Sequence, residues 1–143
     1  MASNLALWWA TLKANIAATT GLGSLDDAPI NVEDWKATLL QPSTRLCAGH
    51  LGLKGGTESE DRHTSGGHKE AIDCTLTVAT INYALTIAGL ADLREALILT
   101  IEQDQTLGGY TDLVTYHGFE VQSQDGFGTV LVLNFTVTEY WEA

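Results

Sequence analysis

The feature that most constrains the fold is an amphipathic stretch spanning residues 90–107. Its polar side carries Asp92 and Glu95, which fall in the first turns of the expected helix, where the helix dipole favours negative charge. Gly108 and Gly109 are expected to end this helix, because glycine readily takes the left-handed conformation of a helix C-terminus. Strand-like sequence lies on both sides, so we expect a helix that covers one face of a sheet. The apolar residues with mostly the spacing of one helix face are Leu90, Leu93, Leu97, Ile98, Ile101 and Leu107.

A second helix is expected near the start of the chain, where Ser3 and Asn4 are residue types that cap helix N-termini. The apolar residues that follow at helical spacing are Leu5, Trp8, Trp9, Leu12 and Ile16, and Gly21 and Gly23 mark the end. Two adjacent tryptophans have too much apolar area for one narrow stripe. We therefore expect one in the core and the other at its margin or against a partner, with both in one core as the alternative.

The next part of the chain gives weaker signals. Residues 25–42 read as irregular chain with one short helical turn that begins near Asn31 and cannot continue past Pro42. Residues 44–53 fit an extended segment. Residues 54–69, with the sequence KGGTESEDRHTSGGHK, contain no aliphatic or aromatic side chain. We expect a long mobile loop there, of the kind that binds a partner or is ordered by one.

Three later stretches alternate as strands do. Residues 70–83 place Ile72, Cys74, Leu76 and Val78 on one face. Residues 112–122 form a second strand, and an Asp125-Gly126 turn leads into the last one, residues 129–141. This last strand is apolar on both faces in its middle, so it is either central or covered on one face by a neighbouring subunit. The residues expected to share a face of the second strand are Leu113, Thr115, His117, Phe119 and Val121.

Together these elements predict a single domain over residues 1–143. Its fold class is α+β, with a roughly four-stranded, mainly antiparallel sheet and two helices packed on one face. A chain of this length buries roughly 68–70% of its unfolded surface, so it folds without disulfides or metals.

The charge balance restricts the partners. Eighteen acidic residues against seven basic ones give a formal net charge of −11, which argues against gripping nucleic acid or anionic membranes. The simpler interpretation is that the charge keeps the protein soluble. Cys47 and Cys74 are expected to be buried free thiols. The start of the chain lacks the pattern of a signal peptide, and no apolar run approaches the ~20 residues that cross a bilayer, so we predict a soluble intracellular protein.

No catalytic or metal motif emerges from the sequence. His63 and His68 lie near Glu60 and Asp61, but a mobile loop lacks the supporting contacts of a metal site. The Cys47-x-x-His50 spacing, with Cys74 nearby, fits zinc poorly because such pairs come from tight knuckles, not strands. The glycines around Lys54 lack the Gly-Lys-Ser/Thr of a phosphate loop. His117 is interpreted as a structural histidine, so we predict a protein that is not an enzyme and needs neither cofactor nor metal.

Three segments carry a resemblance to a known family. They are the opening amphipathic helix, the strand over residues 72–83 that leads to the helix around residues 92–97, and the closing strand over residues 130–140. In this layout the chain resembles the tail terminator proteins of long-tailed bacteriophages and their relatives among tail-completion and neck proteins.

The resemblance implies a structural virion protein in the neck region of the tail, assembled in the host cytoplasm. Its members form a homo-oligomeric ring, commonly a hexamer, at the head-proximal end of the tail tube. The ring stops tube polymerisation and offers a docking surface to the head–tail connector protein. DNA would only pass through its lumen, whose negative walls offer no cations to displace the DNA counterions. No membrane is implied.

Two alternatives stay open: another neck or head-completion protein, and a small acidic enzyme or ligand-binding domain whose site is assembled only in three dimensions. For the ring-forming function we expect the contacts with partners on the tryptophan pair, the loop and the last strand. The candidate interface residues are Trp8, Trp9, Glu58, Glu60, Asp61, Arg62, Val130, Val132, Tyr140 and Trp141.

Overall fold

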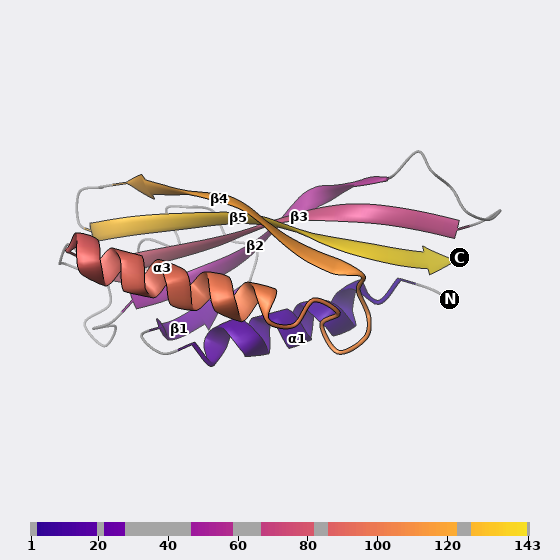
Figure 1. The fold of residues 1–143 in the computed structure, drawn as a ribbon, viewed down its shortest axis with the longest axis horizontal. Helices are drawn as coiled ribbons and strands as arrows, with labels where there is room; N and C mark the ends of the chain where they lie inside the picture. The colour runs from indigo at the N-terminus through magenta and orange to yellow at the C-terminus, as the bar shows by residue number, and fades with distance from the viewer. Residues whose placement is uncertain are drawn as a thin grey trace.

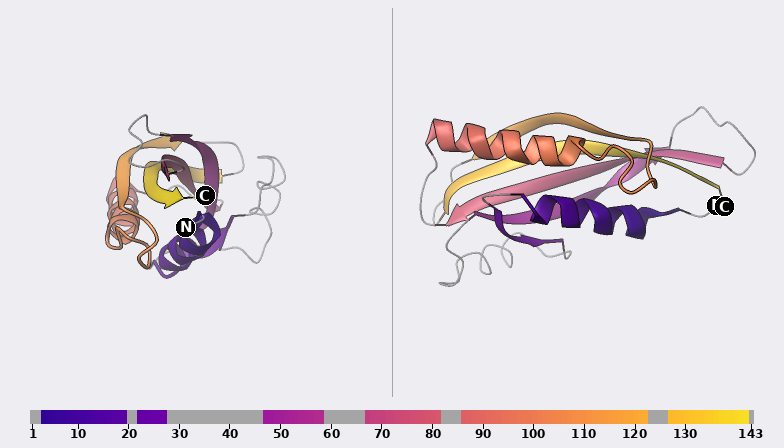
Figure 2. Two further views of the ribbon diagram at one scale, coloured as in Figure 1. Left: turned by 90° about the vertical axis from the view of Figure 1, so that its right-hand side faces the viewer. Right: turned by 60° about the horizontal axis from the view of Figure 1, so that its bottom comes forward.

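The computed structural model describes residues 3–19, 22–27, 47–58, 67–81, 86–122 and 127–142. These residues form one sheet with two helices on its concave side (Figures 1 and 2). The strand order is β1-β2-β3-β5-β4, with β1 parallel to β2 and the other neighbours antiparallel. The elements in chain order are α1 (Leu5–Ala17), β1 (Leu22–Asp26), β2 (Cys47–Glu58), β3 (Gly67–Ile81), α3 (Ile87–Glu102), β4 (Leu113–Gln122) and β5 (Phe127–Glu142).

The expected sheet of roughly four mainly antiparallel strands is wrong, because the described residues form a curled, mixed sheet of five. The strand that the sequence did not reveal is β1. It spans five residues and pairs in parallel with the start of β2, from Leu22 opposite Cys47 to Asp26 opposite His50. Parallel partners are distant in sequence, so no hairpin signal marks such a strand. The helical turn expected near Asn31 lies outside the described residues.

The boundaries of the expected loop at residues 54–69 are also wrong at both ends. Residues 54–58 belong to β2 and residues 67–69 to β3, and the ladder between them reaches Glu58 opposite Glu70. Gly56 shows how β2 can pair with β3 in a segment that has no apolar side chains. A Cβ at this position would lie 2.7 Å from Ile72 Cδ1, so backbone pairing and close approach hold the strands together. Residues 59–66, and their expected mobility, lie outside the described residues.

The core lies between the two helices and the concave face of the sheet. On α1, Trp8 is fully buried and Trp9 is partly buried, which confirms the expected division between the two tryptophans. On β3, Ile72, Cys74 and Leu76 point into the core, as their alternation predicted. The remaining buried positions of the helices are Leu12, Ile16, Leu93, Leu97 and Ile101.

Helix α3 begins and ends earlier than the sequence indicates. Thr86 caps it by accepting a hydrogen bond from the Gly89 backbone N–H at 3.1 Å, so Asp92 and Glu95 lie beyond the first turn. The helix ends at Glu102, and a turn follows in which Leu107, Gly108 and Gly109 all have positive φ. Leu107 is fully buried as expected, but it reaches the core from this turn and not from the helix. Neither described helix is long and apolar enough to cross a membrane.

Strand β4 does not keep its five expected residues on one face. The pairing with β5 shifts between Tyr116 and Gly118, and Gly118 has φ +151°, a backbone conformation that favours glycine. The extra residue reverses the alternation. Leu113, before the bulge, is on the convex side, whereas Phe119, after it, is opposite the buried Leu133 on the concave side.

Strand β5 is an interior strand of the sheet, paired with β3 on one side and with β4 on the other. This confirms the interior position, one of the two alternatives that its two apolar faces predicted. Its concave side contributes Leu131, Leu133, Phe135 and Val137 to the main core. On the opposite side, Val130 joins a small separate cluster with Ala48 and Ala79, and Val132 packs against it.

Candidate functional site

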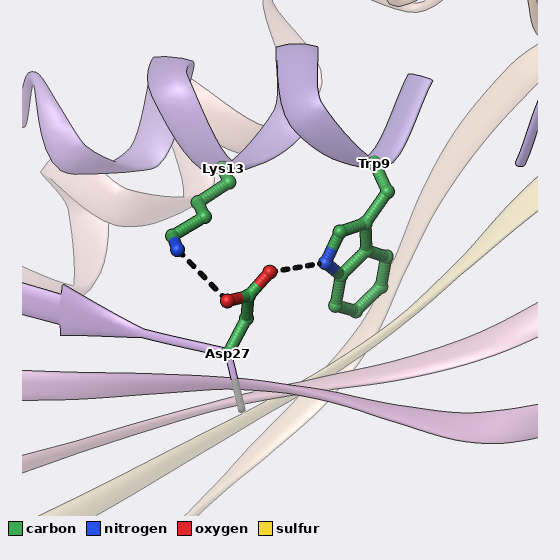
Figure 3. A network of polar contacts seen from close by, with 3 residues as sticks. All are labelled: Trp9, Lys13 and Asp27. Carbon is green, nitrogen blue, oxygen red and sulfur yellow. Dashed lines mark hydrogen bonds and ion pairs between the residues drawn. The ribbon is translucent and has the colours of Figure 1, made fainter. Parts of the chain in front are cut away.

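The most distinctive polar contact lies beside an apolar pocket between α1, β1 and β2. Trp9 and Lys13 are four residues apart, so both lie on one side of α1 and reach the same carboxylate just after β1 (Figure 3). The Trp9 indole N–H donates to Asp27 Oδ2 at 2.7 Å, and Lys13 Nζ lies 2.8 Å from Asp27 Oδ1. The hydrogen bonds from Lys13 and Trp9 lower the pKa of Asp27 below its ordinary value, so the carboxylate is charged at neutral pH.

The pocket measures about 270 Å³ and is lined by Leu5, Ala6, Trp9, Asp27 and Leu53. Both oxygens of Asp27, the one carboxylate among these described lining residues, are occupied by Lys13 and Trp9. The other described lining residues are apolar, and Leu53 is 50% exposed. The volume lies below the roughly 300–1,000 Å³ of common small-molecule sites. The pocket therefore suits an apolar side chain of a partner better than a substrate.

The two edges of the sheet are the second part of the site. Strand β1 covers β2 only over Cys47–His50, and no described strand pairs with residues 51–57 on that edge. At the opposite edge, no described strand pairs with the outer side of β4. Such edges present backbone N–H and C=O groups that can pair with another chain.

Strand β4 also carries two large apolar side chains that are nearly half exposed. Phe119 is 45% exposed and Val121 is 47% exposed, both on the concave side after the bulge. Arg94 of α3 lies over the Phe119 ring, with its guanidinium carbon 4.5 Å from the ring centroid. The Phe119 ring is thereby held in place while nearly half of its surface faces solvent. A partner that covers this edge would remove that apolar surface from water.

The far end of the concave face carries a row of three carboxylates on neighbouring strands. Glu58 is opposite Glu70 on β3, and Glu70 is opposite Glu139 on β5. Like charges in directly opposed positions destabilise a sheet unless each is compensated. His68 Nδ1 lies 2.5 Å from Glu58 Oε1, and the Trp141 indole N–H donates to Glu70 at 2.5 Å.

The third carboxylate, Glu139, is only 1% exposed and is compensated by the start of α1. It accepts a hydrogen bond from the Asn4 backbone N–H at 2.5 Å and another from the Ser3 hydroxyl at 3.0 Å. Asn4 occupies the expected N-cap position but its side chain makes no capping bond, whereas the Ser3 hydroxyl accepts from the Leu5 backbone N–H at 3.3 Å and Glu139 of a distant strand holds Asn4. Sequence reasoning missed Glu139, because only strand pairing brings it to the helix.

The candidate interface residues fall into several environments. Trp8 has no exposed surface to offer a partner, and Val130 is 5% exposed. Trp9 and Val132 are partly buried, at the Trp9 pocket and on the convex side of the sheet respectively. Glu58 and Trp141 both contact His68, whose ring stacks on Trp141 with centroids 4.4 Å apart, and the Tyr140 hydroxyl donates to Glu142. Glu60, Asp61 and Arg62 lie outside the described residues.

The suggested metal sites find no support in the described part of the chain. No group of three potential His, Cys, Asp or Glu ligands occurs there, and His63 is not among the described residues. Cys47 and Cys74 are buried and unbridged, as expected. Cys74 is opposite Leu53, whereas Cys47 adjoins the Ala48–Ala79 pair at the other end of the ladder. Burial, followed by the nearby Asp73 charge, raises the pKa of Cys74 to about 12.

His117 takes part in a hydrogen-bonded chain on the convex side. Its Nε2 lies 2.6 Å from the Thr136 hydroxyl, which in turn donates to Asp73 Oδ1 at 3.1 Å. Because the threonine proton points to Asp73, His117 serves as the donor and does not activate the hydroxyl. The three residues link three adjacent strands, β4, β5 and β3.

Comparison of the sequence with protein-family models and with curated proteins finds no match in either case.

Proposed function

We propose that this protein is a structural component of a phage tail. It forms a homo-oligomeric ring at the head-proximal end of the tail tube, stops tube polymerisation and provides the docking surface for the head–tail connector. The proposal rests first on the resemblance in layout, with an opening helix, the succession of β3 and α3, and a long closing strand.

The observation that carries the proposal is the exposed apolar surface on the concave side of β4, where Phe119 is 45% and Val121 is 47% exposed. Exposed apolar patches on a folded domain mark places where another protein binds. Beside the Trp9 pocket lies a second edge with which no described strand pairs, so one subunit offers two different surfaces. Two different surfaces on one chain are what head-to-tail association into a closed ring requires.

The acidic balance fits the same function. With a net charge of −11, the lumen of the proposed ring would have few basic side chains on its walls. DNA would therefore keep its own counterions and slide through. The neck region of the virion is the location that we propose. Copies of this chain, the tail tube protein and the connector protein are the proposed partners.

Tube growth provides the test. Purified chain mixed with polymerising tail tube protein is expected to cap tubes and shorten their length distribution, as seen by electron microscopy. Light scattering on the chain alone is expected to show a ring-sized oligomer under assembly conditions. A subunit that assembles only on a tube end would be a monomer in solution, so tube length decides. An unchanged length distribution at excess chain would overturn the proposal.

A further inference from the structure

The two sheet edges with which no described strand pairs, the outer side of β4 and residues 51–57 of β2, suit each other. Phe119 and Val121 of β4 are opposite Leu133 and Leu131, both of which point into the core, so their side chains lie on the concave side. Leu53 of β2 is opposite the buried Cys74, so it lies on the concave side as well. Each edge thus exposes apolar side chains on the same face of the sheet.

The charged residues of the two edge strands differ in sign where the pairing would form, although Arg94 of α3 lies over Phe119 and Glu58 follows the open part of β2. Residues 112–122 contain Asp112 and Glu120 and neither lysine nor arginine, whereas residues 51–57 contain Lys54 and no carboxylate. Pairing β4 with another β4 would bring acidic residues together, and pairing two β2 edges would bring lysines together. Among the residues of the two strands, only the unlike pairing brings Lys54 near a carboxylate, Glu120, which favours it over either symmetric dimer.

The strand directions satisfy the geometry of a ring. β4 is antiparallel to β5, β5 to β3, and β3 to β2, so β4 and β2 run in opposite directions. A rotation about an axis parallel to the strands leaves these directions unchanged. It therefore brings β4 of one copy antiparallel to β2 of the next, with both concave faces on the same side.

We propose that β4 of one subunit pairs with residues 51–57 of β2 in a second copy, placing Phe119 against Leu53 at the mouth of the Trp9 pocket. This inference rests on the self-association in the proposed function and names the surfaces that carry it. Because β1 occupies the β2 edge as far as His50, the pairing begins at Leu51. In the register that we propose, Val121 is opposite Leu51 and Phe119 is opposite Leu53, which keeps the concave side chains of both strands on one face. The pocket, at about 270 Å³, then receives apolar surface that each subunit otherwise exposes.

Cysteine cross-linking tests the pairing. Phe119→Cys and Leu53→Cys, prepared separately and mixed under mild oxidation, are expected to give disulfide-linked dimers. Neither variant alone is expected to do so, because each carries a cysteine on only one of the two surfaces, and the proposed pairing joins unlike surfaces. The parent chain is the background control, since Cys47 and Cys74 are buried. Leu113→Cys mixed with Leu53→Cys is the matched control, because Leu113 is equally exposed but lies on the convex side.

A charge exchange gives a second readout without removing an apolar contact. Lys54→Glu should weaken association about five-fold, the equivalent of ~1 kcal/mol per exposed pair, and Glu120→Lys should do the same. The double variant carrying both changes should recover the parent affinity.

The outcomes separate this inference from the proposed function. Linked dimers from a single cysteine variant would mean symmetric pairing and overturn the inference. The inference would also be overturned if the chain forms oligomers but the cysteine mixture does not cross-link and the double variant does not recover the parent affinity. A ring held together by other surfaces would then still be possible. Failure to shorten tubes overturns the proposed function, whatever the cross-linking shows.

Discussion

The concave face of the sheet has two parts that share the same strands but differ in chemistry. Beneath α1 and α3, the inward positions of β3 and β5 are apolar and closed to solvent, as in the pair of Leu76 and Leu133. β3 and β5 continue past the start of α1 (Figure 1). There the inward positions are Glu70 and Glu139, and the latter is as completely buried as the apolar residues.

The difference shows that strand alternation determines the face of a residue but not its surroundings. Where a helix lies across the sheet, apolar side chains fill the space between them. Where the helix begins, its first N–H groups lack acceptors within the helix, and a carboxylate can supply one. Glu139 does so for Asn4, so a buried acid becomes part of the helix start.

The largest effect should come from the apolar part. Leu97→Ala is expected to lower the free energy of unfolding by about 2–5 kcal/mol, because Leu97 is fully buried against the sheet. Leu99 lies two residues further along α3 and is 69% exposed, so Leu99→Ala is the matched control and should change stability by no more than about 0.5 kcal/mol. Urea unfolding of both variants makes the measurement. Equal losses would mean that α3 presents a different face to the core.

An intermediate effect is expected at the polar end. Glu139→Ala should cost about 1–3 kcal/mol in unfolding free energy, because it leaves the Asn4 N–H and the Ser3 hydroxyl without their acceptor. Ser3→Ala removes one of these donors and keeps the other, so its cost should be smaller, about 0.5–1.5 kcal/mol. Hydrogen exchange at the first amides of α1 should speed up in the Glu139 variant. Unchanged exchange and stability would show that the carboxylate is not what anchors the helix.

The smallest effect concerns Asp27, at the border of the pocket. Its pKa is lowered in the folded protein, so its contribution to stability is present above its unfolded pKa and is lost as pH falls through the folded pKa. Asp27→Asn should therefore be about 0.2–1 kcal/mol less stable than the parent at pH 7 and close to it at pH 2. Urea unfolding at several pH values measures this difference. A gap that widens in acid would contradict the ion pair with Lys13.

Local periodicity predicted those parts of the structure whose environment repeats along one segment. The two helices, the core positions Trp8, Leu12, Ile16, Leu93 and Leu97, and the inward residues of β3 all follow from spacing alone. The division between Trp8 and Trp9 follows from side-chain area. One residue of the candidate site, Trp9, could be predicted in this way, because it was expected at the margin of the core or against a partner.

The other features depended on which distant segments meet. Pairing with β2 makes a strand of the unpatterned β1, and pairing with β3 extends β2 through a stretch without apolar residues. A single bulge in β4 places Phe119 on the concave side of the sheet. The start of α1 donates hydrogen bonds to the buried Glu139. Sequence periodicity reports how a segment is shaped, whereas the choice of partner strand is a long-range interaction that leaves no local signature. For that reason the helices and core could be predicted from the sequence, whereas the two edges with which no described strand pairs were decided only by the tertiary structure.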